Sequence, residues 1–246
     1  MGSDGLKIGV IGAGAWGTAL ARLLANSGNS VQLWCREPET AKNILQKHVN
    51  TSFLPDILLP ELLGASTDLL EIVRNSRILV AAPPSHLTRE IAKKIRPEIT
   101  AKHILLILSK GIEQHSLALM SEIFAEELDN LPKLAVLSGP TFAREVALDL
   151  PSAAVLACAD QTAGLLLQKC FHSDRFRIYR STDLVGVQLG GSIKNVIAIA
   201  SGIADGMQLG LNARAALICR GVAEMSRLGT AMGGSAETFM GMSGIG

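Results

Sequence analysis

Short apolar runs alternate with amphipathic segments over the first three-quarters of this chain, and this alternation limits its fold more than any other sequence feature. The runs are rich in Val, Ile, Leu and Ala without polar alternation, as expected for strands covered on both faces. Segments with helical periodicity separate them, for example 15–26, 86–95 and 117–128. This order is typical of βαβ units and predicts a doubly wound, mostly parallel sheet. The predicted strands are 6–11, 31–35, 78–82, 104–108, 134–137 and 153–157.

Three glycines at a fixed spacing follow the first predicted strand. Gly12, Gly14 and Gly17 form a Gly-x-Gly-x-x-Gly pattern directly before a predicted helix. In a dinucleotide-binding turn the first glycine permits a tight bend, the second lets the backbone approach a pyrophosphate, and the third lets the helix pack on the strand. A plain glycine turn has the same composition, but the strand, the helix and the spacing together favour a dinucleotide site.

Arg36 directly follows the second predicted strand, at the place where an NAD-specific site usually carries an acidic residue. Because arginine can bind a 2′-phosphate at this place, we expect NADP to be accepted. The adjacent Glu37 can serve a free ribose hydroxyl, which keeps NAD as a second cofactor. The alternative is an arginine that simply ends the strand in solvent.

The sequence pattern changes near residue 183. Residues 183–204 and 212–232 carry few strand or turn signals and many Ala, Gly, Ile and Leu. We interpret these two segments as long buried helices that open an all-α second domain. The predicted fold class is therefore α/β, with a Rossmann-like dinucleotide-binding domain over 1–183 and the beginning of a helical substrate domain over 184–246.

Residues that could bind a substrate or take part in catalysis follow two of the later strands. Lys110 comes directly after the strand 104–108, and ligands of open α/β sheets bind at the carboxyl ends of strands. A lysine there can hold a phosphate or polarise a carbonyl, although a solvated loop lysine is the alternative. Gly139 and Thr141 follow the strand 134–137 and suit close contact with a small polar substrate.

Lys194 lies in a segment that is otherwise apolar on nearly every helical face. An unpaired buried ammonium costs several kcal/mol, so such a lysine either pairs or has a lowered pKa. The residues alone leave two hypotheses open, a structural ion pair and a catalytic group.

Composition excludes several classes of protein. The chain of 246 residues is 48% hydrophobic and 18% charged, so it can bury a large core. A net charge of +1 gives no reason to expect a nucleic acid or an anionic membrane as partner. No metal-ligand spacing is visible, and the histidines are expected at the surface. The cysteines are predicted to be buried as small apolar residues, in a protein of a reducing compartment. They are Cys35, Cys158, Cys170 and Cys219.

Targeting signals are not evident in the sequence. The first residues lack the basic and apolar regions of a signal peptide. The most apolar long stretch, 184–203, has Lys194 at its centre, which argues against a membrane span. We therefore expect a cytoplasmic protein without an integral membrane segment. The oligomeric state is left open, with a homodimer as one hypothesis.

Taken together, seven segments resemble the NAD(P)-dependent glycerol-3-phosphate dehydrogenase family of the soluble bacterial type. The most specific are SGPTFAREVA (138–147) and GGSIKNVIAIASGIADG (190–206). The resemblance implies an oxidoreductase that reduces dihydroxyacetone phosphate to sn-glycerol 3-phosphate with NAD(P)H, for glycerophospholipid synthesis. The other segments are GAGAWGTALA (12–21), LWCRE (33–37), NTSFLP (50–55), APPSH (82–86) and SKGIE (109–113).

The resemblance also implies roles for individual residues. Lys194 would be the general acid/base, and it would contact the substrate together with Lys110, Gly139 and Thr141. Phe53 would lie near the cofactor. Contacts with the dinucleotide would come from Gly12, Gly14, Ala15, Trp16, Gly17, Arg36, Lys110 and Ala143.

One departure from the family lies at the end of the sequence. The chain stops at 241–246, within a family motif. The family continues with an aspartate that orients the lysine and with a basic segment that binds substrate phosphate. We therefore expect a truncated polypeptide that binds dinucleotide but lacks activity.

Two rival hypotheses stand beside this resemblance. The first is another two-domain NADP-dependent hydroxyacid dehydrogenase with a lysine in its helical domain. The second is a non-catalytic dinucleotide sensor, which would not need lysines at both 110 and 194. Turnover with dihydroxyacetone phosphate distinguishes them.

Overall fold

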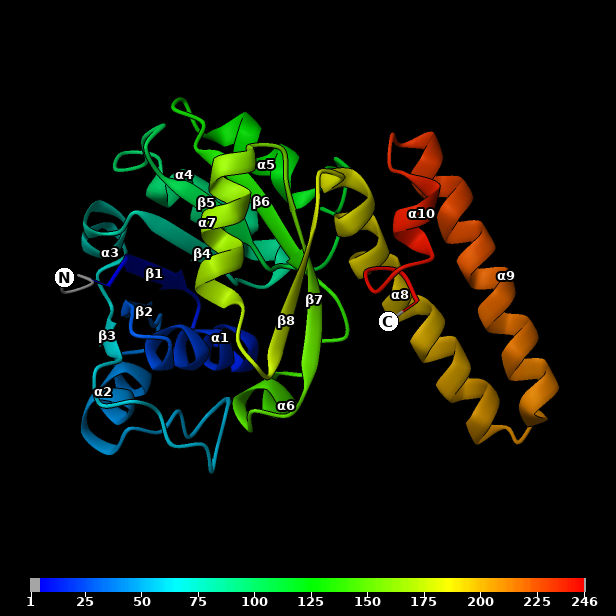
Figure 1. Ribbon diagram of the computed structural model, residues 1–246, viewed down its shortest axis with the longest axis horizontal. Coiled ribbons are helices and arrows are strands. Elements are labelled where there is room, and N and C mark those ends of the chain that lie inside the picture. The colour runs from blue at the N-terminus through cyan, green and yellow to red at the C-terminus, as the bar shows by residue number, and fades with distance from the viewer. Residues whose placement is uncertain (1–4, 246) are drawn as a thin grey trace.

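Eight strands form one sheet in the computed structural model, which describes residues 5–245 (Figure 1). Neighbouring strands follow the order β3-β2-β1-β4-β5-β6-β7-β8. All neighbouring pairs are parallel except β6 and β7. The predicted mostly parallel, doubly wound sheet is confirmed. The strands are β1 Lys7–Ile11, β2 Ser30–Trp34, β3 Gly64–Ser66, β4 Ile78–Ala81, β5 Ile104–Ile107, β6 Lys133–Ser138, β7 Ser152–Cys158 and β8 Phe176–Ser181.

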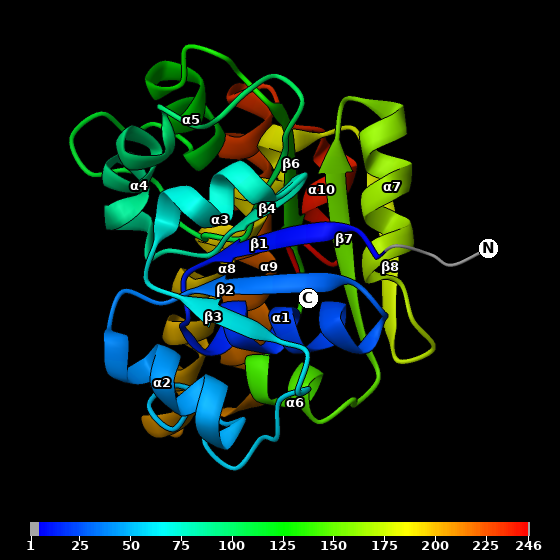
Figure 2. The same ribbon diagram turned by 90° about the vertical axis from the view of Figure 1, so that its left-hand side faces the viewer.

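Helices cover both faces of this sheet. Figure 2 shows α1 and α6 on one side of the strands and α3, α4 and α5 on the other, and the two sets of buried residues agree with that division. The helical extension formed by α8, α9 and α10 lies beyond the β6–β8 end of the sheet (Figure 1). The helices are α1 Ala15–Asn26, α2 Pro38–Lys47, α3 Leu69–Asn75, η1 Ser85–Leu87, α4 Thr88–Ile95, α5 Met120–Glu127, α6 Ala143–Ala147, α7 Gln161–Phe171, α8 Leu184–Gly206, α9 Gly210–Ala231 and α10 Ala236–Phe239.

α1 illustrates how the sequence pattern builds these layers. Leu20, Leu23 and Leu24 recur at a spacing of three and four residues, which places them on one helical face. All three are buried against the sheet, in the same cluster as Val10 of β1 and Leu33 of β2. Val10 and Leu33 are register partners, so one helix covers both strands.

α8 connects the sheet to the helical extension. Asp183 caps its first turn, where Oδ1 accepts a hydrogen bond from the Gly186 backbone N–H at 2.8 Å. The other carboxylate oxygen accepts from Ser235 N–H at 2.8 Å and from the Thr238 hydroxyl at 2.7 Å, which ties α10 to the beginning of α8. Residues 186–191 are buried, so α8 is part of the packed sheet as well as of the extension. A domain division at residue 183 stays a prediction.

The prediction that both long helices are buried is wrong for much of their length. Val196, Ile199 and Ile203 of α8 are 65, 64 and 57% exposed. In α9, the buried residues are Val222, Met225 and Gly229. The physical reason is that α8 and α9 pack on each other along one stripe, and no layer covers their outer faces within residues 5–245.

Two strands, β3 and β8, were not predicted. β3 has three residues, too few for a pattern. β8 alternates, with Phe176 and Ile178 buried and Arg177 and Tyr179 exposed. Because β8 is an edge strand with one face in solvent, it has the period-2 pattern rather than a continuous apolar run.

Two expectations about burial of single residues also need correction. Cys219 of α9 is exposed, whereas the other three cysteines are buried. His103 is buried rather than at the surface, because its ring nitrogens bond with Thr100 and with the Val73 carbonyl oxygen.

Within the described residues, α8 is the helix whose length and composition would suffice to cross a membrane, and 33% of its most apolar window is buried. The buried part is the N-terminal third, where Val187 packs among sheet and helix residues.

Candidate active site

A cleft of about 620 Å³ opens at the carboxyl ends of β1 and β4. It is lined by the glycine turn over 12–17, which follows β1, and by the segment 82–85, which follows β4. The strand order reverses between these two strands, and open α/β sheets bind ligands at such a switch point. The volume lies within the range of sites for cofactors and other small molecules.

The three glycines of the turn have distinct geometric roles. Gly12 has φ +115°, a backbone conformation that other residues rarely adopt. A Cβ on Gly17 would lie 2.1 Å from the Gly12 carbonyl oxygen, so only glycine fits where the helix meets the strand. A Cβ on Gly14 would meet nothing within 4 Å and would project into open space at the cleft.

The N-terminus of α1 presents free donors to this cleft. Gly14 is its N-cap and makes no side-chain cap, and the first turn holds no acidic residue. The first N–H groups of the helix therefore lack the side-chain acceptor that usually satisfies them. An anion at this position would accept those hydrogen bonds and would be stabilised by the helix dipole. The residues present thus fit the pyrophosphate of a dinucleotide.

Asn50 fixes the shape of the glycine turn from a distant loop. Its Nδ2 donates to the Ala13 carbonyl oxygen at 2.8 Å and to the Thr18 hydroxyl at 2.9 Å. Its Oδ1 accepts from Phe53 N–H at 3.2 Å, which holds Phe53 beside the cleft that it lines. The sequence analysis placed Phe53 of the segment 50–55 near the cofactor but did not identify Asn50. A buried asparagine belongs to no hydrophobic or motif pattern that would mark it in the sequence.

A second cleft of about 400 Å³ adjoins the first. Lys110 and Thr141 line both clefts, whereas Gly139 and Lys194 line the second. Gly139 adopts φ +157°, and its carbonyl oxygen accepts a hydrogen bond from Lys110 Nζ at 3.4 Å. The residues predicted for substrate and catalysis therefore line one cleft, the second, and two of them also line the first.

Close contacts dock α8 against the loops that carry these residues. A Cβ on Gly191 would lie 2.2 Å from the Ser138 hydroxyl oxygen, so glycine lets α8 approach the end of β6. The Ser192 hydroxyl accepts a hydrogen bond from Gly111 N–H at 2.8 Å, next to Lys110. Gln188 bonds with Ser121 at the start of α5, accepting from its N–H at 3.0 Å and donating to its hydroxyl at 2.8 Å. Lys194 lies close beyond these contacts on the same helix.

Burial changes the acidity of both lysines, and a neighbouring charge changes that of Lys194 as well. Burial lowers the pKa of Lys194, and the charge of Lys110 lowers it further, to about 8. Burial also lowers the pKa of Lys110. A lysine with a pKa near neutrality can both donate and accept a proton, which is the requirement for general acid/base chemistry.

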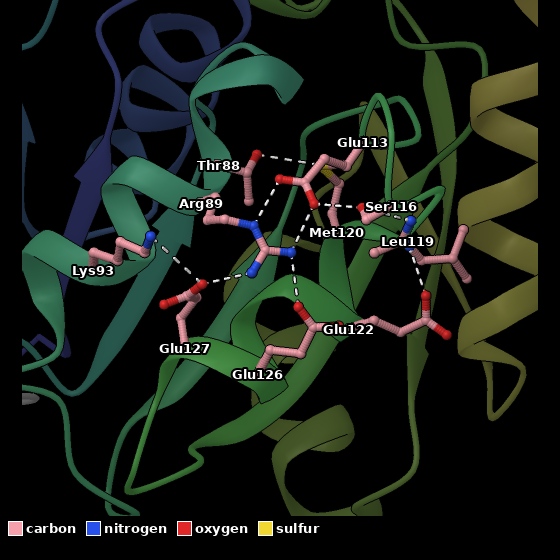
Figure 3. Close-up of polar contacts among 11 residues, drawn as sticks. Thr88, Arg89, Lys93, Glu113, Ser116, Leu119, Met120, Glu122, Glu126 and Glu127 are labelled. Carbon is pink, nitrogen blue, oxygen red and sulfur yellow. Dashed lines mark hydrogen bonds and ion pairs between the residues drawn. The ribbon is translucent and has the colours of Figure 1, made fainter.

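Arg89 holds the loop after β5 in place through an ion-pair network (Figure 3). Its guanidinium from α4 donates two hydrogen bonds to Glu113, at 2.8 and 2.6 Å. It also donates to Glu126 at 2.7 Å and to Glu127 at 2.5 Å, both on α5. Glu113 belongs to the same loop as Lys110, so the network restrains the segment that connects the two clefts.

The contact between Arg89 and Glu113 makes the stability of the protein depend on pH in the acidic range. Hydrogen bonds from Arg89 and then from Ser116 lower the pKa of Glu113 to about 2, against roughly 4.3 in an unfolded chain. The stabilisation is complete above about pH 4.3 and is lost as the pH falls towards 2. We expect Arg89→Met to flatten the fall in urea midpoint between pH 5 and 2.5. The exposed pair of Arg220 and Glu224 on α9 gives the control: Arg220→Met should keep the steep wild-type fall, and an equally steep fall in Arg89→Met would contradict this role.

Of the remaining residues predicted to contact the dinucleotide, three line the first cleft and one lines neither cleft. Ala15, Trp16 and Arg36 line the first cleft. The side chain of Arg36 is 70% exposed and pairs with Glu37 at 2.7 Å. Ala143, the first residue of α6, packs against the core and lines neither cleft, so its contact with the cofactor stays a prediction.

Asn195 is a cleft residue that sequence reasoning missed. It lines the second cleft next to Lys194, and its position directly after the lysine was the available signal. Among residues 5–245, no group of three or more His, Cys, Asp or Glu side chains could hold a metal ion.

The strand order β3-β2-β1-β4-β5-β6 with a glycine turn at its switch point defines a dinucleotide-binding protein of the Rossmann class. Two family models match the chain: the N-terminus of NAD-dependent glycerol-3-phosphate dehydrogenase over residues 7–164 and its C-terminus over residues 183–246. The chain therefore belongs to the NAD-dependent glycerol-3-phosphate dehydrogenase family, whose cofactor is NAD or NADP.

Similar proteins agree with this assignment. The glycerol-3-phosphate dehydrogenase (NAD(P)+) of Paramagnetospirillum magneticum is 50% identical over 98% of this chain and 86% of its own length. The enzyme of the same name from Citrifermentans bemidjiense is 48% identical over 98% of this chain and 72% of its own length. The crystal structure of glycerol-3-phosphate dehydrogenase from Coxiella burnetii superposes with a TM-score of 0.93 at 41% identity, covering 98% of this chain and 74% of that one.

Proposed function

We propose that this protein reduces dihydroxyacetone phosphate to sn-glycerol 3-phosphate with NADH or NADPH, and that Lys194 is its general acid/base. The observation that carries the proposal is that Lys194 and Lys110 line one cleft, and that Lys110 also lines the adjoining dinucleotide cleft. A phosphorylated ketone has two groups that interact with cations, the phosphate and the polarised carbonyl oxygen. Two partly buried lysines in one space suit both.

Protein groups would bind the cofactor along the first cleft. The N–H groups at the start of α1 would hold the pyrophosphate, and Gly14 would leave room for it. Arg36 and Glu37 lie at the end where a ribose 2′ position is read. When bound, the reduced nicotinamide supplies the hydride for the carbonyl carbon.

The lysines would act on the substrate in the second cleft. Negative charge develops on the carbonyl oxygen as the carbonyl carbon is reduced, and a nearby cation stabilises it in a site of low dielectric. Lys194 Nζ would donate the proton that this oxygen gains, and in the reverse direction neutral Lys194 would accept it from the alcohol. Lys110 lowers the pKa of Lys194 and would itself contact the substrate, with Gly139 and Thr141 closing the space.

The decisive test is turnover by the full-length protein with dihydroxyacetone phosphate and each reduced cofactor. A panel of keto acids, assayed in parallel, tests the rival hypothesis of a hydroxyacid dehydrogenase. Selective oxidation of NADH or NADPH with dihydroxyacetone phosphate supports the proposal. Preference for a keto acid contradicts it, and binding of NADPH without turnover of any carbonyl compound favours a dinucleotide sensor.

Arg36 should discriminate between the two cofactors. We expect Arg36→Asp to weaken NADPH use far more than NADH use, because a phosphate would lose a charged hydrogen bond worth about 1.5–3 kcal/mol. Comparison of kcat/KM for the two cofactors measures the effect. Arg36→Gln is the control that removes the positive charge without adding a negative one, and it should shift the preference in the same direction by a smaller amount. Equal losses with both cofactors would rule out a phosphate contact.

The wider setting of the enzyme is part of the same proposal. The product would supply glycerophospholipid synthesis, and the reaction would take place in the cytoplasm. The homodimer also stays a prediction, which light scattering on the full-length protein tests.

A further inference from the structure

A second cation lies at the same end of the dinucleotide cleft as Arg36. Lys94 belongs to the last turn of α4 and lines the cleft. Leu87, Glu90 and Ile91 line it as well, and with Lys94 they recur at spacings of three, four and seven residues. One face of this helix segment therefore borders the site.

Each cation near this end is paired with a carboxylate from its own segment. Lys94 Nζ is 2.6 Å from Glu90 Oε1, one helical turn away. Arg36 Nε is 2.7 Å from Glu37 Oε1. All four side chains line the cleft, so two cations and two carboxylates share its rim.

The two pairs are close enough to influence each other. The hydrogen bond from Lys94 lowers the pKa of Glu90, and the charge of Arg36 lowers it further. Arg36, which follows β2, therefore acts electrostatically on a residue of α4. The side chains of Lys94 and Glu90 are 53% and 57% exposed, and exposed ion pairs of this kind are weak. A ligand with more charge can exchange for either carboxylate.

A phosphate monoester has that property. It carries a charge of about −1.5 to −2 near pH 7 and three acceptor oxygens, so it can engage two cations at once. The free hydroxyl of NAD has neither the charge nor the acceptors to separate Lys94 from Glu90. The cleft thus offers different partners to the two cofactors at this end.

We propose that Lys94 binds the 2′-phosphate of NADP together with Arg36, and that Glu90 holds Lys94 when this phosphate is absent. This inference rests on the proposed function only in taking NADP as a cofactor. Glu90 and Lys94 are then specificity-determining residues with opposite effects. Lys94 favours NADPH as a ligand, and Glu90 opposes it by competing for the lysine and by repelling the phosphate.

The neighbouring residue Lys93 provides a matched control. It lies in the same helical turn, and its side chain is 62% exposed. It points to Glu127, at 3.9 Å, on the side of α4 that carries the Arg89 network (Figure 3). Lys93 is not among the residues that line the cleft. Substitutions at 93 and 94 remove the same charge from the same helix end.

The test is equilibrium binding of NADPH and NADH by the full-length protein, with 2′,5′-ADP and 5′-AMP as fragments that differ only in the phosphate. We expect Lys94→Gln to raise the Kd of NADPH and of 2′,5′-ADP about tenfold, the loss of one charged hydrogen bond at an exposed site. The Kd of NADH and 5′-AMP should change less than about twofold. Glu90→Gln should lower the Kd of NADPH severalfold, and Lys93→Gln should leave all four values unchanged.

The outcomes separate this inference from the proposed function. If Lys94→Gln shifts both cofactors equally, or if Lys93→Gln matches it, Lys94 is not a phosphate ligand. An unchanged or raised Kd of NADPH in Glu90→Gln contradicts the restraint by Glu90, and thermal melts show whether each variant is folded. Turnover of dihydroxyacetone phosphate by the unmodified protein decides the proposed function independently, since the binding ratios need no turnover.

Discussion

Lys194→Met in the full-length protein is expected to lower the rate constant for reduction of dihydroxyacetone phosphate by roughly 10²–10⁴, the usual contribution of general acid/base catalysis. NADPH affinity should stay near normal, because Lys194 lines the second cleft rather than the dinucleotide cleft. Single-turnover rates and equilibrium binding on the same variant measure both quantities.

The stability of Lys194→Met distinguishes catalysis from a purely structural role. Methionine fills a similar volume without a charge, so a catalytic lysine can be replaced with little change in the free energy of unfolding. A structural ion pair predicts the reverse, a loss of about 3–5 kcal/mol with activity that follows the folded fraction. A folded variant with near-native turnover would remove Lys194 from the mechanism.

The pH profile gives a further signature of Lys194. Reduction needs the protonated lysine, so the rate should fall as the pH rises through the pKa of about 8. Oxidation of glycerol 3-phosphate needs the neutral lysine and should rise over the same range. Lys194→Met should lose this dependence in both directions, whereas a structural lysine would leave the profile of the residual activity unchanged.

Gly14→Val is expected to abolish dinucleotide binding while the fold survives. A Cβ at Gly14 meets nothing within 4 Å, and its φ of −67° and ψ of 174° suit a β-branched residue. The free energy of unfolding should therefore change by no more than about 0.5 kcal/mol. The added side chain would occupy the space that the pyrophosphate needs beside the N-terminus of α1. Calorimetric titration with NADPH and thermal melts test the two halves of this prediction.

Gly17→Val is the contrasting variant in the same turn. Its Cβ would lie 2.1 Å from the Gly12 carbonyl oxygen and 3.2 Å from Ala82 Cβ, so the backbone must shift. We expect a loss of at least about 1–3 kcal/mol of stability, as for overpacking in a core.

A folded Gly14→Val protein that binds NADPH normally would refute the role of the glycine turn in pyrophosphate binding.

Features that depend on local sequence were predictable without a structure. The strands buried on both faces, the glycine turn and α1 follow from hydrophobic pattern and backbone freedom, which act over a few residues. The same applies to Lys194, since a lysine in an apolar helix stands out on energetic grounds. The half-exposed edge strand β8 was missed because its pattern resembles an ordinary polar segment.

Other features depend on contacts between distant segments. The outer faces of α8 and α9 are exposed although their composition suggests burial, because exposure depends on what packs against a helix. Asn50, Arg89 and Glu113 gain their importance from partners far along the chain. Hydrophobic periodicity in the sequence does not predict which distant residues will be in contact.

The sequence by itself determined the doubly wound sheet, the position of the dinucleotide turn and the lysine of the helical segment. Only the tertiary structure decided that Lys110 and Lys194 share one space and that Lys94 borders the same cleft as Arg36. The physical reason is that strand order and helix docking bring together groups that are remote in sequence. Short-range patterns fix each element, whereas the packing of elements fixes the distances between charges on which the proposed chemistry depends.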